Sequence, residues 1–273
     1  MKQLKKSIWY ILSFLLVLAL TLTTTNQIKR IHAQALLDSS LHNAFTVWQH
    51  TELAPASDSG RPTRISHRRI LAHWSDGSTF TQVENIETGM VTRDFVDASR
   101  QLRRSVADGV SSVSTQHLSA QETAAAISRD LLLHDPSKDC LAGGNEHNTI
   151  LGHETMLNIA VTKIRVNVPG PVDWVVYDAP ALNCSTVAQR TDWRSSAGIS
   201  TETLDRVSIG EPDRSLLEVP SYYAELSPSE LARKKMVYFQ GRFPNFAAKP
   251  GMIDNKVAQI AEKQDAAYVA HQK

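Results

Sequence analysis

Recognisable catalytic signatures are missing from this chain of 273 residues. It contains no G-x-S-x-G nucleophile elbow, no phosphate-binding P-loop and no dinucleotide-binding G-x-G-x-x-G. The stretch HETML at 153–157 lacks the second histidine of the H-E-x-x-H zinc motif, and the spacing of His147 and His153 fits no zinc pattern. We therefore expect a non-catalytic protein with no cofactor and no metal site.

A strong net charge is missing as well, because the formal value is +1. Residues 1–35 hold five basic side chains and no acidic ones, so the rest of the chain carries 24 basic (29 − 5) and 28 acidic residues, a net charge of −4. A body with this balance has no electrostatic reason to bind nucleic acid. Its 42% hydrophobic residues are enough for a globular core.

Long apolar runs are absent except near the N-terminus. Lys2, Lys5 and Lys6 precede the uncharged run SIWYILSFLLVLALTLTTT at 7–25. As a helix this run would be roughly 28 Å long, which is enough to cross a bilayer core. The three lysines favour an export signal or membrane anchor over a buried helix of a soluble protein.

Whether this segment is removed stays open at the sequence level. Ala33-Gln34-Ala35 has the form of a cleavage site, which favours a signal peptide ending at residue 35. The site lies well beyond the apolar run, with Lys29 and Arg30 between them, which favours a retained anchor. Both alternatives place the bulk of the chain in the periplasm or another extracytoplasmic space, and the second adds the inner membrane as a partner through residues 7–25.

Cysteine is scarce, with only Cys140 and Cys184 in the chain. Neither lies near the apolar run, which excludes a lipid-modified N-terminus of the bacterial lipoprotein type. Both fall in polar loops on the exported side, where oxidising conditions favour disulfides. A disulfide is therefore favoured over two free thiols, and both are favoured over a catalytic nucleophile.

The middle of the chain reads as successive strands of an antiparallel sheet. We expect residues 36–62 to be a linker, with a short helix around 43–53, and residues 63–236 to form the sheet domain. Asp76-Gly77 predicts a hairpin, and in SHRRILAHW, at 66–74, we place His67 and His73 on the solvent face of a strand. Further strands are expected at 90–96, 100–106, 110–115, 155–168, 172–178, 186–193 and 202–209.

Three further helices are expected after residue 118. Ser119 and Glu122 form a capping box at the start of a helix over 119–134, which should cover the sheet. Ser227-Pro228-Ser229-Glu230 opens a second helix, and an amphipathic helix follows at 254–270, within a helical tail at 237–273. The fold class is therefore α+β: an N-terminal transmembrane or signal helix, a curved, half-barrel-like antiparallel sheet, a covering helix and C-terminal helices.

Four motifs carry a resemblance to known proteins. They are DGS (76–78), TILGHET (149–155), DWVVYDAPALNC (173–184) and SLLEVPSYYAELSPSE (215–230). In this order they are similar to a group of uncharacterised exported bacterial proteins. The strand order also resembles, more loosely, the outer-membrane lipoprotein carrier fold, in which a curved sheet wraps around a helical lid with an apolar hollow between them. This second resemblance implies a lipid-like ligand.

Two functions are therefore predicted as alternatives. The first is an extracytoplasmic protein that binds an apolar or lipid-like ligand in the hollow, with Ile127, Leu131, Leu132 and Trp174 lining it. The second is a structural or interaction protein of the cell envelope with no small ligand. In the second case the partner would meet the C-terminal aromatic residues Tyr238, Phe239, Phe243 and Phe246.

Overall fold

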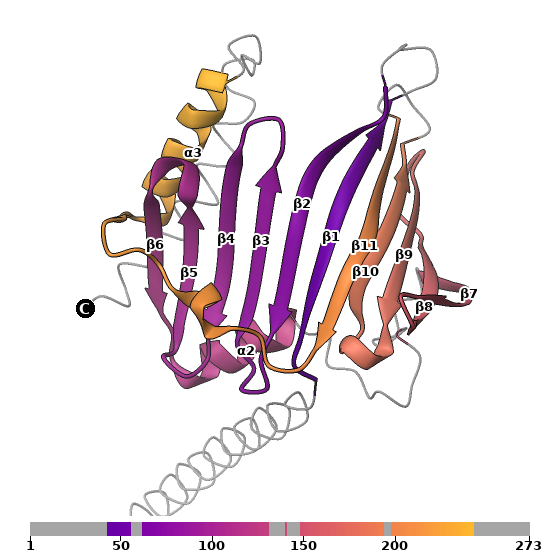
Figure 1. The fold of residues 1–273 in the computed structure, drawn as a ribbon, viewed down its shortest axis with the longest axis horizontal. Helices are drawn as coiled ribbons and strands as arrows, with labels where there is room; N and C mark the ends of the chain where they lie inside the picture. Colours follow the sequence, from indigo (N-terminus) through magenta and orange to yellow (C-terminus); the bar gives the residue numbers. More distant parts are fainter. Residues whose placement is uncertain (1–42, 56–61, 131–139, 141–147, 194–197, 243–273) are drawn as a thin grey trace, which may run out of the picture.

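A computed structural model describes residues 43–55, 62–130, 140, 148–193 and 198–242 (Figure 1). The strands of the described residues are β1 (Phe45–Ala54), β2 (Arg64–His73), β3 (Thr79–Asn85), β4 (Met90–Asp97), β5 (Leu102–Ala107), β6 (Ser112–His117), β7 (Asn148–Met156), β8 (Ile159–Val166), β9 (Asp173–Ala179), β10 (Ser185–Asp192), β11 (Ile199–Ile209) and β12 (Ala224–Glu225). The helices are α2 (Ala120–Asp130), α3 (Pro228–Arg242) and the short 3-10 turns η1 (Asp108–Val110), η2 (Pro180–Leu182) and η3 (Arg214–Leu217).

All these strands belong to one sheet, in the order β12-β6-β5-β4-β3-β2-β1-β11-β10-β9-β8-β7. Two antiparallel meanders, β1 to β6 and β7 to β11, are joined side by side where β1 pairs with β11. The expected antiparallel sheet is therefore mixed in one place, because the two-residue strand β12 pairs in parallel with β6.

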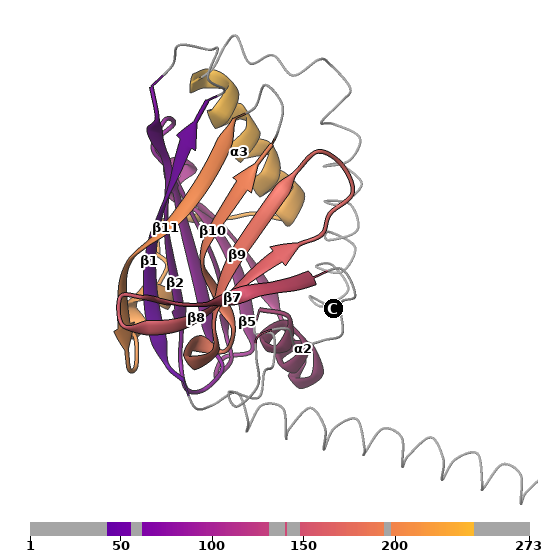
Figure 2. The same ribbon diagram turned by 90° about the vertical axis from the view of Figure 1, so that its right-hand side faces the viewer.

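The sheet is strongly curved, and the two long helices lie on its concave side (Figure 2). The segment 210–223, which contains η3, crosses the opposite, convex side over β2 to β5 (Figure 1). We call this segment the strap. Neither α2 nor α3 is long and apolar enough to span a membrane. The expected membrane segment at 7–25 and the helix at 254–270 lie outside the described residues.

A tight turn between β2 and β3 shows how the local sequence sets this arrangement. Gly77 adopts φ +82°, and its N–H donates to Trp74 O at 3.0 Å. A Cβ at this position would meet Ile127 Cδ1 of α2 at 3.0 Å. The glycine is therefore required both by the turn and by the close approach of α2.

Both long helices begin with capping boxes, as the sequence predicted. Ser119 N–H donates to Glu122 Oε2 at 2.8 Å, and Glu122 N–H donates to Ser119 Oγ at 3.2 Å. Ser227 and Glu230 make the same exchange at the start of α3. These bonds satisfy backbone donors that a helix N-terminus leaves without partners.

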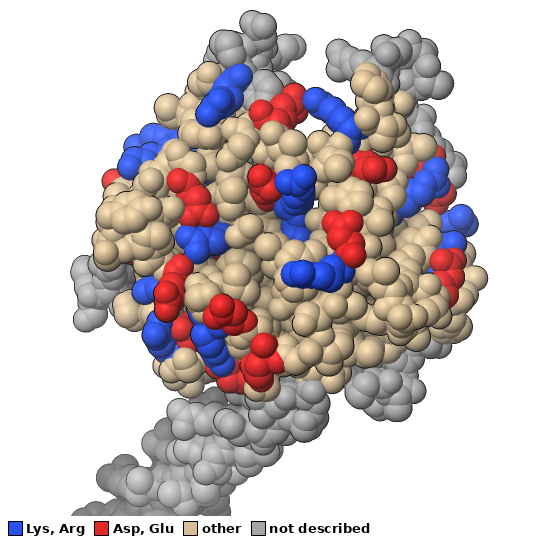
Figure 3. Space-filling view, in the orientation of Figure 1, with Lys and Arg blue, Asp and Glu red and all other residues tan. Residues whose placement is uncertain are grey.

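The convex side is a closed core under the strap. Trp74 is fully buried there, and its Nε1–H donates to Pro212 O at 2.9 Å. Acidic and basic side chains are interspersed over this side of the molecule (Figure 3). Arg214 of the strap pairs with Asp76 at 2.7 Å, and Arg93 of β4 pairs with Asp108 of η1 at 2.7 Å. The buried cluster under the strap consists of Ala72, Trp74, Phe80, Phe95, Val106, Val113 and Leu217.

Two predicted elements were wrong. The helix expected at 43–53, within the supposed linker, is the strand β1, which pairs with β2 on one side and β11 on the other. The single strand expected at 155–168 is instead a hairpin, because Leu157 and Asn158 both adopt positive φ and turn β7 into β8. The expected boundary at 236/237 also falls inside a helix, since α3 continues to Arg242.

Candidate functional site: the concave cavity

A cavity of about 790 Å³ lies on the concave side of the sheet, beside α3. Strand side chains reach it in alternation, as the two-residue period of a pleated sheet requires. The helix contributes Pro228, Leu231, Ala232 and Lys235, whose spacing of i, i+3, i+4 and i+7 places them on one face of α3.

The cavity floor has two rows of cross-strand neighbours. One row runs from β1 to β6 through Phe45, His73, Thr79, Val96, Arg103 and Gln116. The next begins at Val47 of β1, which is buried outside the cavity lining, and runs through Leu71, Thr81, Asp94, Ser105 and Ser114. Both rows begin with aromatic or aliphatic side chains at β1 and end with polar or charged ones at β5 and β6. The floor is therefore apolar near the centre of the sheet and polar near α3.

A chain of polar contacts follows the cavity wall from β2, past β1, to β11, β10 and β9. Arg69 Nη1 lies 3.6 Å from Glu202 Oε1, and Gln189 Nε2 donates to Glu202 Oε2 at 2.8 Å. Trp174 Nε1–H in turn donates to Gln189 Oε1 at 3.1 Å. Glu202 is buried, so these contacts offset the cost of removing its carboxylate from water. They also fix the orientation of the Trp174 indole at the cavity wall.

His73 does not lie on the solvent face that the sequence suggested. Its side chain is buried at the cavity floor beside Phe45, with ring centroids 5.7 Å apart. Burial lowers the pKa of His73, which favours the neutral ring. Nδ1 lies 3.1 Å from the Asn43 carbonyl oxygen, and since a carbonyl only accepts, Nδ1 must be the protonated nitrogen.

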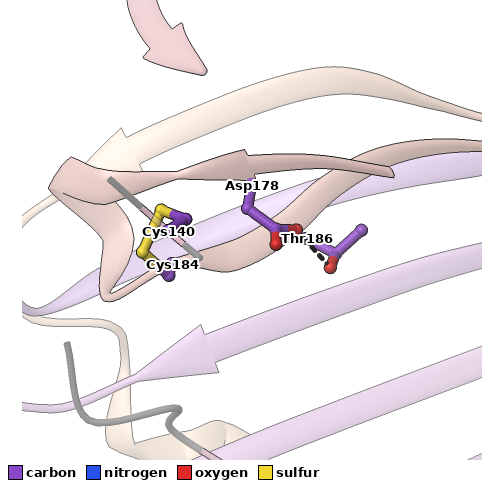
Figure 4. Close-up of a disulfide and its surroundings, with 4 residues drawn as sticks. All are labelled: Cys140, Asp178, Cys184 and Thr186. Carbon is purple, nitrogen blue, oxygen red and sulfur yellow. Dashed lines mark hydrogen bonds between the residues drawn. A yellow bond between two sulfur atoms is a disulfide. The ribbon is translucent and has the colours of Figure 1, made fainter. Parts of the chain in front are cut away.

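The predicted cysteine pair lies at the end of the cavity near β9. Cys140 and Cys184 are bonded, with their Cα atoms 5.4 Å apart (Figure 4). The bond joins the turn between β9 and β10 to the segment between α2 and β7. Together with Ile164 and Val176 the two cysteines form a small buried cluster, against which Trp174 packs.

A buried carboxyl group lies close to the disulfide. Asp178 Oδ1 accepts a hydrogen bond from Thr186 Oγ1 at 2.6 Å (Figure 4). Burial raises the pKa of Asp178, and the Thr186 hydrogen bond opposes this shift only in part. No group of three or more His, Cys, Asp or Glu side chains able to hold a metal occurs within the described ranges.

The residues expected to line the hollow have different positions in the structure. Trp174 lines the cavity, as does Cys184. Ile127 instead packs beneath α2 against Val96 and Leu118, outside the lining of the cavity. Leu131 and Leu132 lie outside the described residues.

Most of the lining was missed at the sequence level. The missed side chains alternate along strands that the sequence did identify, so the strand period was the available signal. This period did not indicate which face of the sheet would be concave. The full lining comprises Phe45, Arg69, Leu71, Ala72, His73, Thr79, Thr81, Asp94, Phe95, Val96, Arg103, Ser105, Ser114, Gln116, Trp174, Val176, Asn183, Cys184, Ser185, Thr186, Gln189, Glu202, Pro228, Leu231, Ala232 and Lys235.

Comparison with known proteins gives distant structural likenesses only. No protein-family model and no curated protein sequence matches the chain. A conserved protein of Thermus thermophilus is similar with a TM-score of 0.42 and 4% identity, over 72% of this chain and 98% of that one. The MucA/MucB complex of Pseudomonas aeruginosa has a TM-score of 0.37 and 11% identity, over 72% and 62%. A LolA-superfamily protein of Nitrosomonas europaea has a TM-score of 0.29 and 9% identity, over 68% and 97%.

These scores are too low to assign a function. The looser resemblance to the lipoprotein carrier fold stays an expectation, because the similarity to the LolA-superfamily protein is too distant to support it. The resemblance to a group of exported bacterial proteins stays an expectation, since no family model matches.

Proposed function

We propose that this protein is an extracytoplasmic binding protein that holds an amphiphilic, lipid-like molecule in the concave cavity without catalysing a reaction. The observation that carries the proposal is the unfilled space of about 790 Å³ between the sheet and α3. Pockets for small ligands usually measure about 300–1,000 Å³. The sequence predicted an apolar or lipid-like ligand. Because the cavity lining is partly polar, it favours the lipid-like alternative, a molecule with both apolar and polar parts.

The extracytoplasmic location has a separate basis. The disulfide is typical of proteins that fold in oxidising compartments, and the lysines before residues 7–25 have the pattern of an export signal. An amphiphile that leaves or enters a membrane would be within reach of a protein in this space.

The alternative, an interaction protein with a filled interior, has less support among the described residues. Tyr238, one residue of the expected aromatic contact surface, packs against the sheet and does not point to solvent. Its hydroxyl donates to Thr88 O at 3.2 Å, and its ring packs near Met90. Phe243 and Phe246 lie outside the described residues. The cavity itself is the feature that a filled interior would lack.

Blocking the cavity tests the proposal. Thr81 lies in the middle of the floor, so the variant Thr81→Trp should fill the space that the ligand needs. We expect the purified wild-type protein, residues 36–273, to bind the neutral fluorescent probe N-phenyl-1-naphthylamine saturably. The variant Thr81→Trp should weaken this binding by about tenfold or more. Fluorescence titration measures the affinity, and thermal unfolding shows whether each variant is folded.

The matched control is Thr203→Trp. Thr203 is an exposed threonine on β11 outside the cavity lining, so the same replacement there should leave probe binding unchanged. Absence of saturable binding by a folded wild-type protein, together with no co-purifying lipid in native mass spectrometry, would refute the proposal and favour the interaction protein.

A further inference from the structure

We infer that the cavity selects amphiphiles with an anionic head, which Arg103 and Lys235 bind at the polar end while the apolar tail lies toward Phe45 and Trp174. This inference rests on the proposed function and adds the chemical class of the ligand.

First, two basic side chains of the cavity lack a partner among the residues that the structure describes. Arg103 projects from β5 and Lys235 from α3, and both line the cavity. Within the described part of the chain, neither side chain makes an ion pair or a hydrogen bond. Other basic side chains of the sheet, such as Arg68, Arg93 and Arg165, each have a carboxylate within 4.0 Å. The cavity thus holds positive charge that the described residues leave uncompensated.

The second step concerns the acids of the same cavity. Only two carboxylates of the described residues line it, Asp94 and Glu202. Glu202 is engaged by Arg69 and Gln189 on the far side of β1. Asp94 accepts a hydrogen bond from its cross-strand neighbour Ser105 and makes no ion pair with Arg103. An anionic group from a ligand would therefore be the counter-ion available to Arg103 and Lys235.

The third step is the direction of the polarity gradient. Side chains beside the cations are Ser105, Ser114 and Gln116, which offer hydrogen-bond donors to an anionic head. At the opposite end the polar groups of Arg69, Gln189 and Glu202 are engaged with one another. Phe45, Val176 and the indole of Trp174 remain there as surfaces that suit an alkyl chain. Because both ends belong to one cavity, a molecule with one charged and one apolar end matches it better than a uniformly apolar lipid.

Four probes of equal chain length test the inference: dodecyl phosphate, dodecanoate, dodecanol and dodecyltrimethylammonium. Each competes with N-phenyl-1-naphthylamine for the wild-type protein. The two anions should displace the probe at concentrations about tenfold or more below the concentration of the alcohol that does so. The cation should be the weakest competitor. Added salt should weaken displacement by the anions and leave that by the alcohol unchanged.

Three variants test which side chains cause the preference for anionic probes. Arg103→Gln and Lys235→Gln should each remove most of the preference for the anions while keeping the affinity for dodecanol. Asp94→Asn should strengthen anion binding, since it removes the negative charge beside the head. The matched control is Arg233→Gln, which changes a neighbouring exposed cation of α3 that is not among the cavity lining residues and should alter nothing.

The outcomes separate the inference from the proposed function. Equal displacement by anions and alcohol, with saturable binding of both, would overturn the anionic head and leave the binding protein standing. Displacement by inorganic phosphate as effective as that by dodecyl phosphate would show a site for a free anion and would overturn the amphiphile. Failure of every probe to bind a folded protein would overturn the proposed function itself.

Discussion

At the scale of single residues, the buried carboxyl of Asp178 gives the molecule a pH dependence with a defined sign. Burial is the largest cause of its raised pKa, so the unfolded chain releases this proton more readily than the folded one. The stability contributed by the protonated group is complete below the unfolded pKa and is lost as pH rises through the folded pKa. Asp178 thus lowers stability at neutral pH relative to a neutral side chain of the same shape.

Replacing Asp178 with Asn should remove this loss. The Asn side-chain oxygen can still accept the hydrogen bond of Thr186, so the variant keeps the contact without the charge. We expect Asp178→Asn to unfold at a higher temperature than wild type at pH about 8, and the difference to shrink toward pH about 4. Thermal unfolding followed by circular dichroism measures it, and a difference that does not change with pH would contradict the assignment.

At the scale of elements, Arg93 makes one of the contacts that hold the strap on the convex side. Arg93 donates to both carboxylate oxygens of Asp108, at 3.1 and 2.7 Å, and to Glu218 O at 2.9 Å. Tyr223 OH adds a 2.8 Å hydrogen bond to Asp108. Burial and the neighbouring Asp108 raise the pKa of Tyr223 to about 12, so its hydroxyl remains a donor over the physiological range.

Removing this arginine should loosen the strap. Arg93→Leu leaves Asp108 without its bidentate partner, and hydrogen bonds to charged groups contribute about 1.5–3 kcal/mol each. We expect the free energy of unfolding in urea to fall by about 2 kcal/mol or more, with faster proteolysis within 210–223. The matched control is Arg64→Leu, whose ion pair with Glu87 is exposed and should contribute less than about 1 kcal/mol. Equal losses for the two variants would refute the role of Arg93.

Some of the strands and turns could be predicted from the sequence, and others could not. Strands bounded by Asp76-Gly77 or by prolines were found, because turn chemistry is local. The hairpin at Leu157-Asn158 was missed, because leucine in a left-handed conformation gives no turn signal. Strand β1 was mistaken for a helix, since Phe45 is specified by its neighbours His73 and Ile209, and the second lies 164 residues away (209 − 45). The cavity has the same origin, because its walls come from β1 to β6, β9 to β11 and α3, which only the tertiary fold brings together.

At the scale of the whole molecule, the proposed export is linked to the disulfide. The bond closes a loop with a sequence separation of 44 residues, which on the chain-entropy model stabilises the fold by about 4 kcal/mol. This stabilisation exists only where the cysteines oxidise, so a chain kept in a reducing cytoplasm would lose it. The bond also fixes the β9–β10 turn beside Trp174, at the apolar end of the cavity.

Expression of the full chain and of a version lacking residues 1–35 in a bacterial host tests this link. The full chain should leave the cytoplasm, and its two cysteines should resist a maleimide reagent after denaturation unless a reductant is added first. The shortened version should stay inside with both thiols reactive. Recovery of the exported chain in detergent extracts of the membrane would show a retained anchor at 7–25, whereas a soluble form beginning at Leu36 would show cleavage.

The variant Cys184→Ser, made in both the exported and the cytoplasmic protein, tests how much the disulfide contributes to the free energy of unfolding. For the purified exported protein, this replacement should reduce the free energy of unfolding by about 4 kcal/mol, because it removes the constraint on the unfolded chain. In the shortened cytoplasmic version the same replacement should change little, because there the bond is absent in both proteins. Urea unfolding of the four purified proteins measures the two differences. A large effect in both compartments would mean that Cys184 stabilises the fold by packing alone.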